Sequence, residues 1–421
     1  MLHRFKALGL LLLITGFTLL NAQNYSNSPY TRFGLGDLQN SGFVYNKAFG
    51  GASSAIRTSN QLNYLNPASF TSQDTNTFLL QSGLTGRFVK LYNDDFKAWR
   101  NNVNLNYLVF GFPVGKYLNS SIGLVPYSRV EYHFTQDALA DKNQTLIQQY
   151  DGSGGLNEFY LGLSGEIYKS ISIGASLNYL FGSFERNRLT KYTTSTSATI
   201  NINENYVADD IFFRFGLQIH PTIGTYHKPV LGIAYEAAVD IESKADNLFT
   251  HYYTVSGTQT ISSLADSSYI ISLPQKLSIG LSYYYKDRIM ITGEYITQDW
   301  SKLVEVNDYT SIRGGIGYRH RSLTERSRSG YFEHIEFRLG GHYTNTYVTI
   351  AGTDILDYGL SFGVGLPWKN YRKVFTSTAF NISYEYGMRG SKENGLLMEN
   401  YHNISFGVVL QDYWFFKSKY D

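Results

Sequence analysis

Residues 158–182 read EFYLGLSGEIYKSISIGASLNYLFG, and this stretch decides the fold class. Apolar side chains recur at every second position, beginning with Phe159 and Leu161, and the same spacing resumes after position 170. A period of two places alternate side chains on opposite faces of a β-sheet. Only Lys169 and Ser170 separate the two runs, so the stretch predicts two strands joined by a tight hairpin turn.

The same alternation returns along the chain and predicts fourteen strands. Their expected spans are 76–89, 101–113, 120–134, 155–168, 171–186, 208–220, 229–243, 273–286, 288–302, 310–320, 332–346, 356–367, 375–388 and 400–414. Longer polar connections are expected at 135–154, 187–207 and 244–272, whereas the connections on the other side are mostly short. An even strand number with short turns at one rim and long loops at the other is typical of bacterial outer-membrane barrels.

The composition favours a membrane barrel over a soluble sandwich. Charged residues make up 17% of the chain, against about 25% in soluble domains. The chain contains 36 Tyr, 27 Phe and 39 Gly, which fits alternating strands with aromatic girdles. No stretch after the N-terminal region has 18 consecutive apolar residues, so no helical membrane span is expected. The predicted fold is an all-β, transmembrane antiparallel β-barrel of about 14 strands.

The first 22 residues have the layout of a secretory signal. Arg4 and Lys6 precede an apolar run at 7–20, and Ala22 offers a small residue for cleavage before Gln23. The alternative is an uncleaved anchor helix, although the run is shorter than the ~20 residues that a span needs. We therefore expect a signal peptide at 1–22, an N-terminal segment at 23–75 and a barrel at 76–421, located in the bacterial outer membrane.

Charge and cysteine content exclude several classes of protein. Removing Arg4 and Lys6 leaves 34 basic residues against 34 acidic ones, and no basic stripe indicates a nucleic-acid partner. The chain has no Cys, which excludes an N-terminal lipid anchor on cysteine, a disulfide and thiolate chemistry.

The segment before the first strand carries a motif. Gly50 and Gly51 are followed by the turn Asn66-Pro67-Ala68. This arrangement resembles the FadL-type outer-membrane channel family, and the chain resembles its Bacteroidetes members, which are related to PorV-like proteins. The resemblance implies fourteen strands and an N-terminal segment that folds into the lumen as a hatch. From the residues alone, glycine flexibility and the rigidity of Pro67 are also explained by an ordered turn that begins the barrel.

A proline interrupts the third expected strand. Because Pro126 cannot donate a hydrogen bond to a ladder, it predicts a bulge, kink or gap near Tyr127 and Ser128. The resemblance implies a lateral opening of the wall at this point, with the 66–68 turn of the hatch beside it. The alternative is a bulge without function.

Two sets of side chains are expected to face the lumen. By parity, Leu108, Phe110 and Phe112 lie opposite Val103 and Leu105 and point inward, as a surface for hatch packing or an apolar ligand pocket. Charged side chains of the same parity are expected to form mutual salt bridges rather than to do acid–base work. These are Glu158, Glu166, Arg214, Glu294, Arg313, Glu336, Arg338 and Glu385.

No pattern indicates an enzyme. The nine His are scattered and lack metal-ligand spacing, so neither a metal nor a cofactor is expected. His133 near Ser128 is the nearest hydrolase-like pair, and no catalytic residue is assigned.

The leading functional hypothesis is an outer-membrane channel for passive uptake of hydrophobic or amphipathic, fatty-acid-like small molecules. The alternative is a plugged barrel that acts as a scaffold or accessory subunit of a secretion or outer-membrane assembly machine. Expected partners are outer-membrane lipid, a hydrophobic small-molecule ligand for the channel, and proteins of such a complex for the scaffold.

Overall fold

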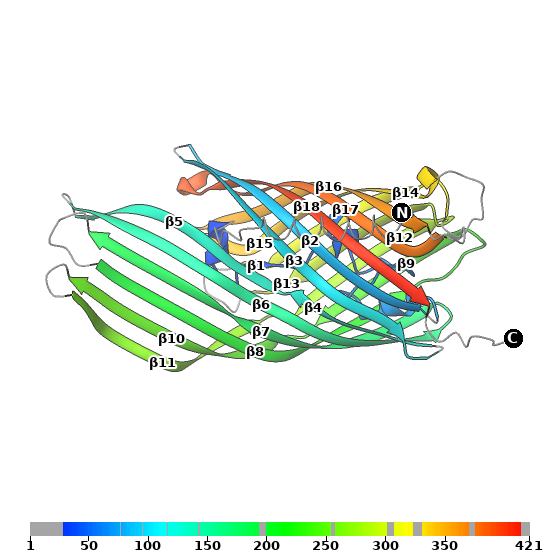
Figure 1. Cartoon of the computed structure of the whole chain (residues 1–421), viewed down its shortest axis with the longest axis horizontal. Coiled ribbons are helices and arrows are strands. Elements are labelled where there is room, and N and C mark those ends of the chain that lie inside the picture. The colour runs from blue at the N-terminus through cyan, green and yellow to red at the C-terminus, as the bar shows by residue number, and fades with distance from the viewer. Residues whose placement is uncertain are drawn as a thin grey trace, which may run out of the picture.

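The computed structural model describes residues 28–413 except 76, 95, 116, 142–143, 193–198, 254–256, 301–306, 323–330 and 370–374. A single antiparallel sheet closes into a barrel around the N-terminal segment (Figure 1). Closure is made by the first and last strands, whose register runs from Thr77 opposite Tyr413 to Tyr92 opposite Met398. The expected signal peptide at 1–22 lies outside the described residues.

The wall is built from seventeen strand segments that form fourteen strands. β4 and β5 are two halves of the third strand, β9 and β10 of the seventh, and β11 and β12 of the eighth. The segments are β2 (Thr77–Tyr92), β3 (Lys97–Pro113), β4 (Leu118–Pro126), β5 (Ser128–Asp141), β6 (Gln144–Tyr168), β7 (Ile171–Tyr192), β8 (Thr199–Ile219), β9 (His227–Glu236), β10 (Val239–Tyr253), β11 (Gly257–Leu273), β12 (Lys276–Tyr285), β13 (Ile289–Gln298), β14 (Tyr309–Arg319), β15 (Glu336–Ile350), β16 (Thr353–Lys369), β17 (Phe375–Gly390) and β18 (Met398–Tyr413). The expected fourteen-stranded antiparallel barrel is confirmed.

Alternation along the strands sets the two faces of the wall. Leu177 is 42% exposed, Phe215 47% and Leu281 64%, and all three lie on the outer face. Their sequence neighbours Ser176, Arg214 and Ser282 are buried on the inner face. The apolar outer face is the surface that a bilayer would cover.

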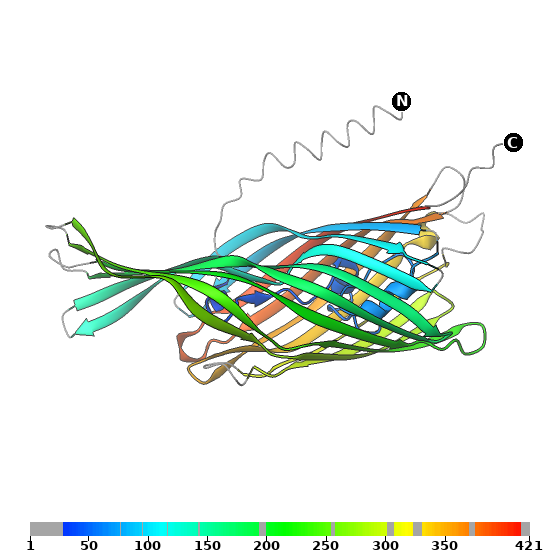
Figure 2. The same cartoon turned by 90° about the horizontal axis from the view of Figure 1, so that it is seen from below.

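The prediction of long loops is wrong. Most of 135–154, 187–207 and 244–272 continues as strand, in the hairpins β5–β6, β7–β8 and β10–β11. These hairpins extend well beyond one end of the barrel (Figure 2). Backbone pairing continues there, for example between Gln136 and Gln148. Polar residues predominate in the sequence of these stretches, so the apolar period of two weakens while the strand persists.

Residues 28–75, called the hatch from here on, lie inside the barrel (Figure 2). Their elements are η1 (Pro29–Arg32), β1 (Asp37–Leu38), α2 (Val44–Lys47) and η2 (Pro67–Ser72); the short helices η3 (Tyr331–His334) and η4 (Glu393–Gly395) lie in connections of the barrel.

Apolar side chains of the hatch form a core with the inner wall. Phe43 and Tyr107 have ring centroids 4.2 Å apart, and Tyr64 lies 5.7 Å from Tyr160. The hydrophobic core of this protein therefore sits in the lumen, between hatch and wall. Within the described ranges, no helix is long and apolar enough to cross a membrane.

Candidate functional site

The glycine pair of the hatch lies against β15 and β16 of the wall. Gly50 and Gly51 have φ angles of 69° and 85°, a region that favours glycine. A Cβ atom at Gly50 would clash with the backbone of Gly341 on β15. The Gly50 N–H also donates to Ser361 Oγ at 3.0 Å. The pair thus allows the backbones of hatch and wall to meet directly.

The Asn66-Pro67-Ala68 turn packs against a different part of the wall. The Asn66 side chain accepts from Ala68 N at 3.1 Å and donates to Ser54 O at 2.7 Å. Gly174 on β7 and Gly216 on β8 leave room for the turn, because a Cβ at either position would clash with it. The turn therefore begins η2 and anchors the hatch to β7 and β8.

The carboxylate of Glu294, on β13, binds the hatch through hydrogen bonds. It accepts hydrogen bonds from the backbone N–H groups of Ser53 at 2.9 Å and Ser54 at 3.0 Å, and from both serine hydroxyls. The side chain is buried, and no ion pair joins it to a cation in the described parts of the chain. Such a carboxylate depends on the hatch backbone for its hydrogen bonds.

Arg214 on β8 lies at the centre of a buried charge group. Its guanidinium contacts Glu158 and Glu236, each at 2.9 Å, and lies 5.3 Å from the ring centroid of Tyr64 in the hatch. Lys276 forms a second ion pair with Glu236. The group joins side chains from β6, β8, β9 and β12 of the wall.

A second buried group holds another hatch side chain. Glu336 pairs with Arg319 and, at 2.9 Å, with Arg338. Tyr45 donates its hydroxyl to Glu336 at 3.2 Å, and its ring centroid lies 4.1 Å from the Arg338 guanidinium carbon.

The remaining charged residues expected in the lumen lie outside the two charge groups around Arg214 and Glu336. Arg313 donates to Asn40 O at 2.7 Å and to Gly51 O at 3.3 Å, so it also holds the hatch. Glu385 lies 3.5 Å from His342. Glu166 is half-buried near the β6–β7 turn.

The expected inward orientation of Leu108, Phe110 and Phe112 is wrong. The β2–β3 register shifts so that Gly83 faces Tyr107 and the next residue of β2 faces Leu105, which leaves Asn106 in a bulge. A bulge adds one residue and reverses the facing of everything beyond it. Leu108 is accordingly 42% exposed on the outer face, and the buried positions are Tyr107, Val109 and Gly111.

The third strand is interrupted at the expected proline. β4 ends at Pro126, and the Tyr127 N–H donates to Leu156 O at 2.8 Å. β5 then pairs with β1 of the hatch, with Ser128 opposite Leu38 and Arg129 opposite Asp37. The hatch part beside the break is therefore residues 37–39 and not the 66–68 turn, because that turn is held by the glycines of β7 and β8.

His133 and Ser128 do not form a catalytic pair. Ser128 is buried, whereas His133 is exposed and contacts Asp151 on β6. Because the two residues are five positions apart on one strand, their side chains point to opposite faces. The described residues contain no group of three potential metal ligands.

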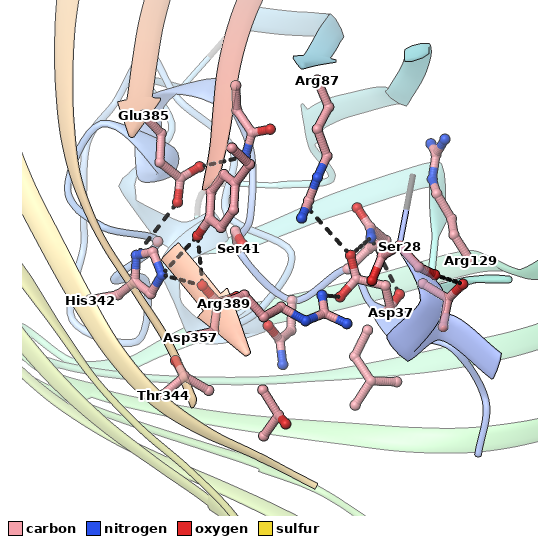
Figure 3. A pocket seen from close by; sticks show the side chains of 18 of the residues that line it. Ser28, Asp37, Ser41, Arg87, Arg129, His342, Thr344, Asp357, Glu385 and Arg389 are labelled. Carbon is pink, nitrogen blue, oxygen red and sulfur yellow. Dashed lines mark hydrogen bonds and ion pairs between the residues drawn. The ribbon is translucent and has the colours of Figure 1, made fainter. Parts of the chain in front are cut away.

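A polar cavity of about 160 Å³ lies between the hatch and the wall break (Figure 3). Asp37 of the hatch pairs there with Arg389 at 2.9 Å and with Arg87 at 3.6 Å. His342, Asp357 and Glu385 line another part of it. The charges of both signs favour water or polar groups over an apolar ligand.

Lys47, on α2 of the hatch, also lines this cavity. Burial lowers the pKa of Lys47 to about 8, with Arg129 and Arg87 acting in the same direction and Glu385 opposing them. The amine donates to Thr85 Oγ1 at 3.1 Å, which ties α2 to β2.

Comparison with solved structures defines the class of protein. The monoaromatic hydrocarbon channel CymD has a TM-score of 0.59 and 16% identity, over 90% of this chain and 99% of that one. The Pseudomonas putida toluene transporter TodX has a TM-score of 0.59 and 14% identity, over 90% and 100%. A Pseudomonas aeruginosa FadL homologue has a TM-score of 0.57 and 13% identity, over 86% and 96%. The chain thus has the β-barrel fold of these FadL-type channels.

The sequence profile of the BamG family matches residues 1–421, so the chain belongs to the BamG family. No curated protein matches the chain.

Proposed function

We propose that this protein is a plugged barrel that serves as a subunit of an outer-membrane assembly machine. The observation that carries the proposal is the attachment of the hatch, which reaches the wall through buried charged groups at Glu294, Arg214, Glu336 and Arg313. Opening a path for a small molecule would break several of these contacts. The family name BamG fits an assembly complex.

The cavity beside the wall break supports the same proposal. It holds about 160 Å³ and is lined by ionised side chains such as Arg87, Asp37 and Arg389. Pockets for drug-sized ligands are commonly 300–1,000 Å³ and mostly apolar. Moreover, the expected apolar lining at Leu108 lies on the outer face of the wall.

A second candidate is a lateral channel for hydrophobic compounds. It is favoured by the interruption of the wall at Pro126 and by the fold shared with the toluene and monoaromatic hydrocarbon channels. Fatty-acid-like cargo, a place among the Bacteroidetes and a relation to PorV-like proteins stay predictions of the sequence.

A depletion experiment with a hatch lock separates the two candidates. Thr71 of the hatch and Ser172 of β7 have side-chain oxygens 2.7 Å apart, and the chain has no native Cys, so T71C/S172C offers one disulfide across the two parts. Outer-membrane protein levels and toluene uptake are measured in depleted cells that carry the wild type, the lock or either single variant. The reduced lock serves as a further control.

The assembly role predicts that depletion lowers outer-membrane protein levels and that the oxidised lock restores them. The channel role predicts that depletion lowers uptake, that the oxidised lock fails to restore it, and that outer-membrane protein levels stay constant. That second pattern would contradict the proposal.

A further inference from the structure

In the described part of the chain, one edge of the barrel wall lacks a neighbouring strand. β3 pairs with β2 along its length, but on its other side the ladder to β4 begins only at Leu108, opposite Leu124. Over the residues that the structure describes, the segment 97–107 has no strand on that side. The edge is about ten residues long, which is the length of a membrane-spanning strand.

β5 is held away from this edge by the hatch. Besides the pairing with β1, Thr31 Oγ1 donates to Glu131 O at 3.0 Å and accepts from Glu131 N at 3.1 Å. Gln39 N donates to Tyr127 O at 2.9 Å. The backbone around the start of β5, at residues 127–131, therefore has its hydrogen-bond partners in the hatch. Closing the wall onto β3 would break these hydrogen bonds.

Among the described residues, the hydrogen bonds between the two sides of the break are donated by side chains. Asn102 Nδ2 donates to Glu131 Oε2 at 2.6 Å, and the Arg129 guanidinium donates to Leu105 O at 3.3 Å. Long side chains bridge a space where adjacent strands would exchange direct backbone bonds.

The outward face of the edge carries three apolar side chains besides the exposed polar residues Lys97 and Asn101. Trp99, Val103 and Leu105 point outward and are 59%, 47% and 61% exposed. Asn102 and Asn104 alternate with them and are half-buried. An unpaired backbone group facing hydrocarbon costs several kcal/mol, so such an edge favours an occupant with its own N–H and C=O groups.

We propose that residues 97–107 of β3 receive a transmembrane β-strand of another outer-membrane barrel protein through backbone pairing. The inference rests on the assembly role proposed above and assigns the contact site of that role. An acyl chain or an aromatic hydrocarbon fills space but offers no backbone groups to the edge. A strand with alternating apolar and polar side chains satisfies both the edge and its membrane setting.

The test uses the purified full chain and a defined strand. The probe is a synthetic peptide with the sequence of residues 398–413, an antiparallel barrel strand of this same chain, and the control is a scrambled peptide of identical composition. At saturating peptide, hydrogen exchange at every second amide of 97–107 is expected to slow at least about tenfold, which corresponds to roughly 1.4 kcal/mol. The scrambled peptide is expected to leave exchange unchanged.

A photo-crosslinking residue at Trp99 locates the contact. Its matched control is the same residue at Tyr295, which is 46% exposed on β13 between two paired neighbours. Adducts with the peptide are expected at Trp99 and at most at a tenth of that level at Tyr295. The proposal would be overturned by equal crosslinking at Trp99 and Tyr295, or by unchanged hydrogen exchange at 97–107 with the peptide. It would also be overturned if phospholipid alone protected these amides, or if crosslinks within the protein formed at Trp99 without peptide.

This result is independent of the depletion experiment. If depletion lowers outer-membrane protein levels but the peptide does not pair, the assembly role stands and the edge is not its contact site. If depletion has no effect, the assembly role is wrong whatever the peptide does.

Discussion

Glu294→Ala tests whether the hatch is held by its hydrogen bonds to the wall. The substitution leaves the backbone N–H groups of Ser53 and Ser54 without their acceptor. A buried donor that loses its partner costs about 1–3 kcal/mol, so two cost about 2–6 kcal/mol. Because about 1.4 kcal/mol is tenfold in an equilibrium constant, hydrogen exchange at these two amides should accelerate by at least about 25-fold.

Glu294→Gln keeps an acceptor oxygen and removes the charge, so we expect a smaller acceleration. Glu185→Ala is the control, because Glu185 is exposed on β7 and accepts a hydrogen bond from Asn203 on the neighbouring β8. Exchange is measured by mass spectrometry on protein folded in detergent micelles. If Glu294→Ala changes exchange at 53 and 54 by less than about threefold, the carboxylate does not hold the hatch and the reasoning is refuted.

Four further predictions follow from the geometry. Arg at Leu281 or at Leu108 should each destabilise the folded barrel by about 2–4 kcal/mol in a refolding titration if the site lies near the midplane; no effect at Leu108 would contradict the reversed facing beyond the bulge. Arg214→Met should cost about 3–5 kcal/mol in the same titration, because it leaves buried Glu158 without its cation and Glu236 with Lys276 alone, and a loss under about 1 kcal/mol would argue against the charge group. Pro126→Val should leave toluene uptake by cells unchanged, whereas slower uptake would favour the lateral channel. Sequencing of the membrane-extracted protein should begin at Gln23, and a start at Met1 would rule out cleavage.

The sequence determined the architecture because alternation is a local property. Phe159 and Leu161 alternate with buried neighbours, and the two strands turn at Lys169 and Ser170 as expected. Pro126 likewise marks the break in the third strand from its own chemistry, since it has no N–H to donate. The charges expected on the inner face at Arg214 and Glu336 do lie there and form ion pairs.

Only the tertiary structure showed the features that depend on a one-residue shift in strand register or on contacts between distant segments. The bulge at Asn106 reversed Leu108 and its neighbours, and a period-two pattern cannot reveal a single unpaired residue. The hairpins beyond the wall carry a weaker apolar alternation than the strands of the wall, so their strand pairing was missed in the sequence. The positions of the hatch turns depend on glycines more than a hundred residues away, such as Gly216 and Gly341. Hatch residues 37–39 form hydrogen bonds with the backbone at the start of β5, and β3 therefore has no strand beside residues 97–107 in the described part of the chain. The hatch and β3 are far apart in the chain, so this arrangement exists only once the barrel has closed.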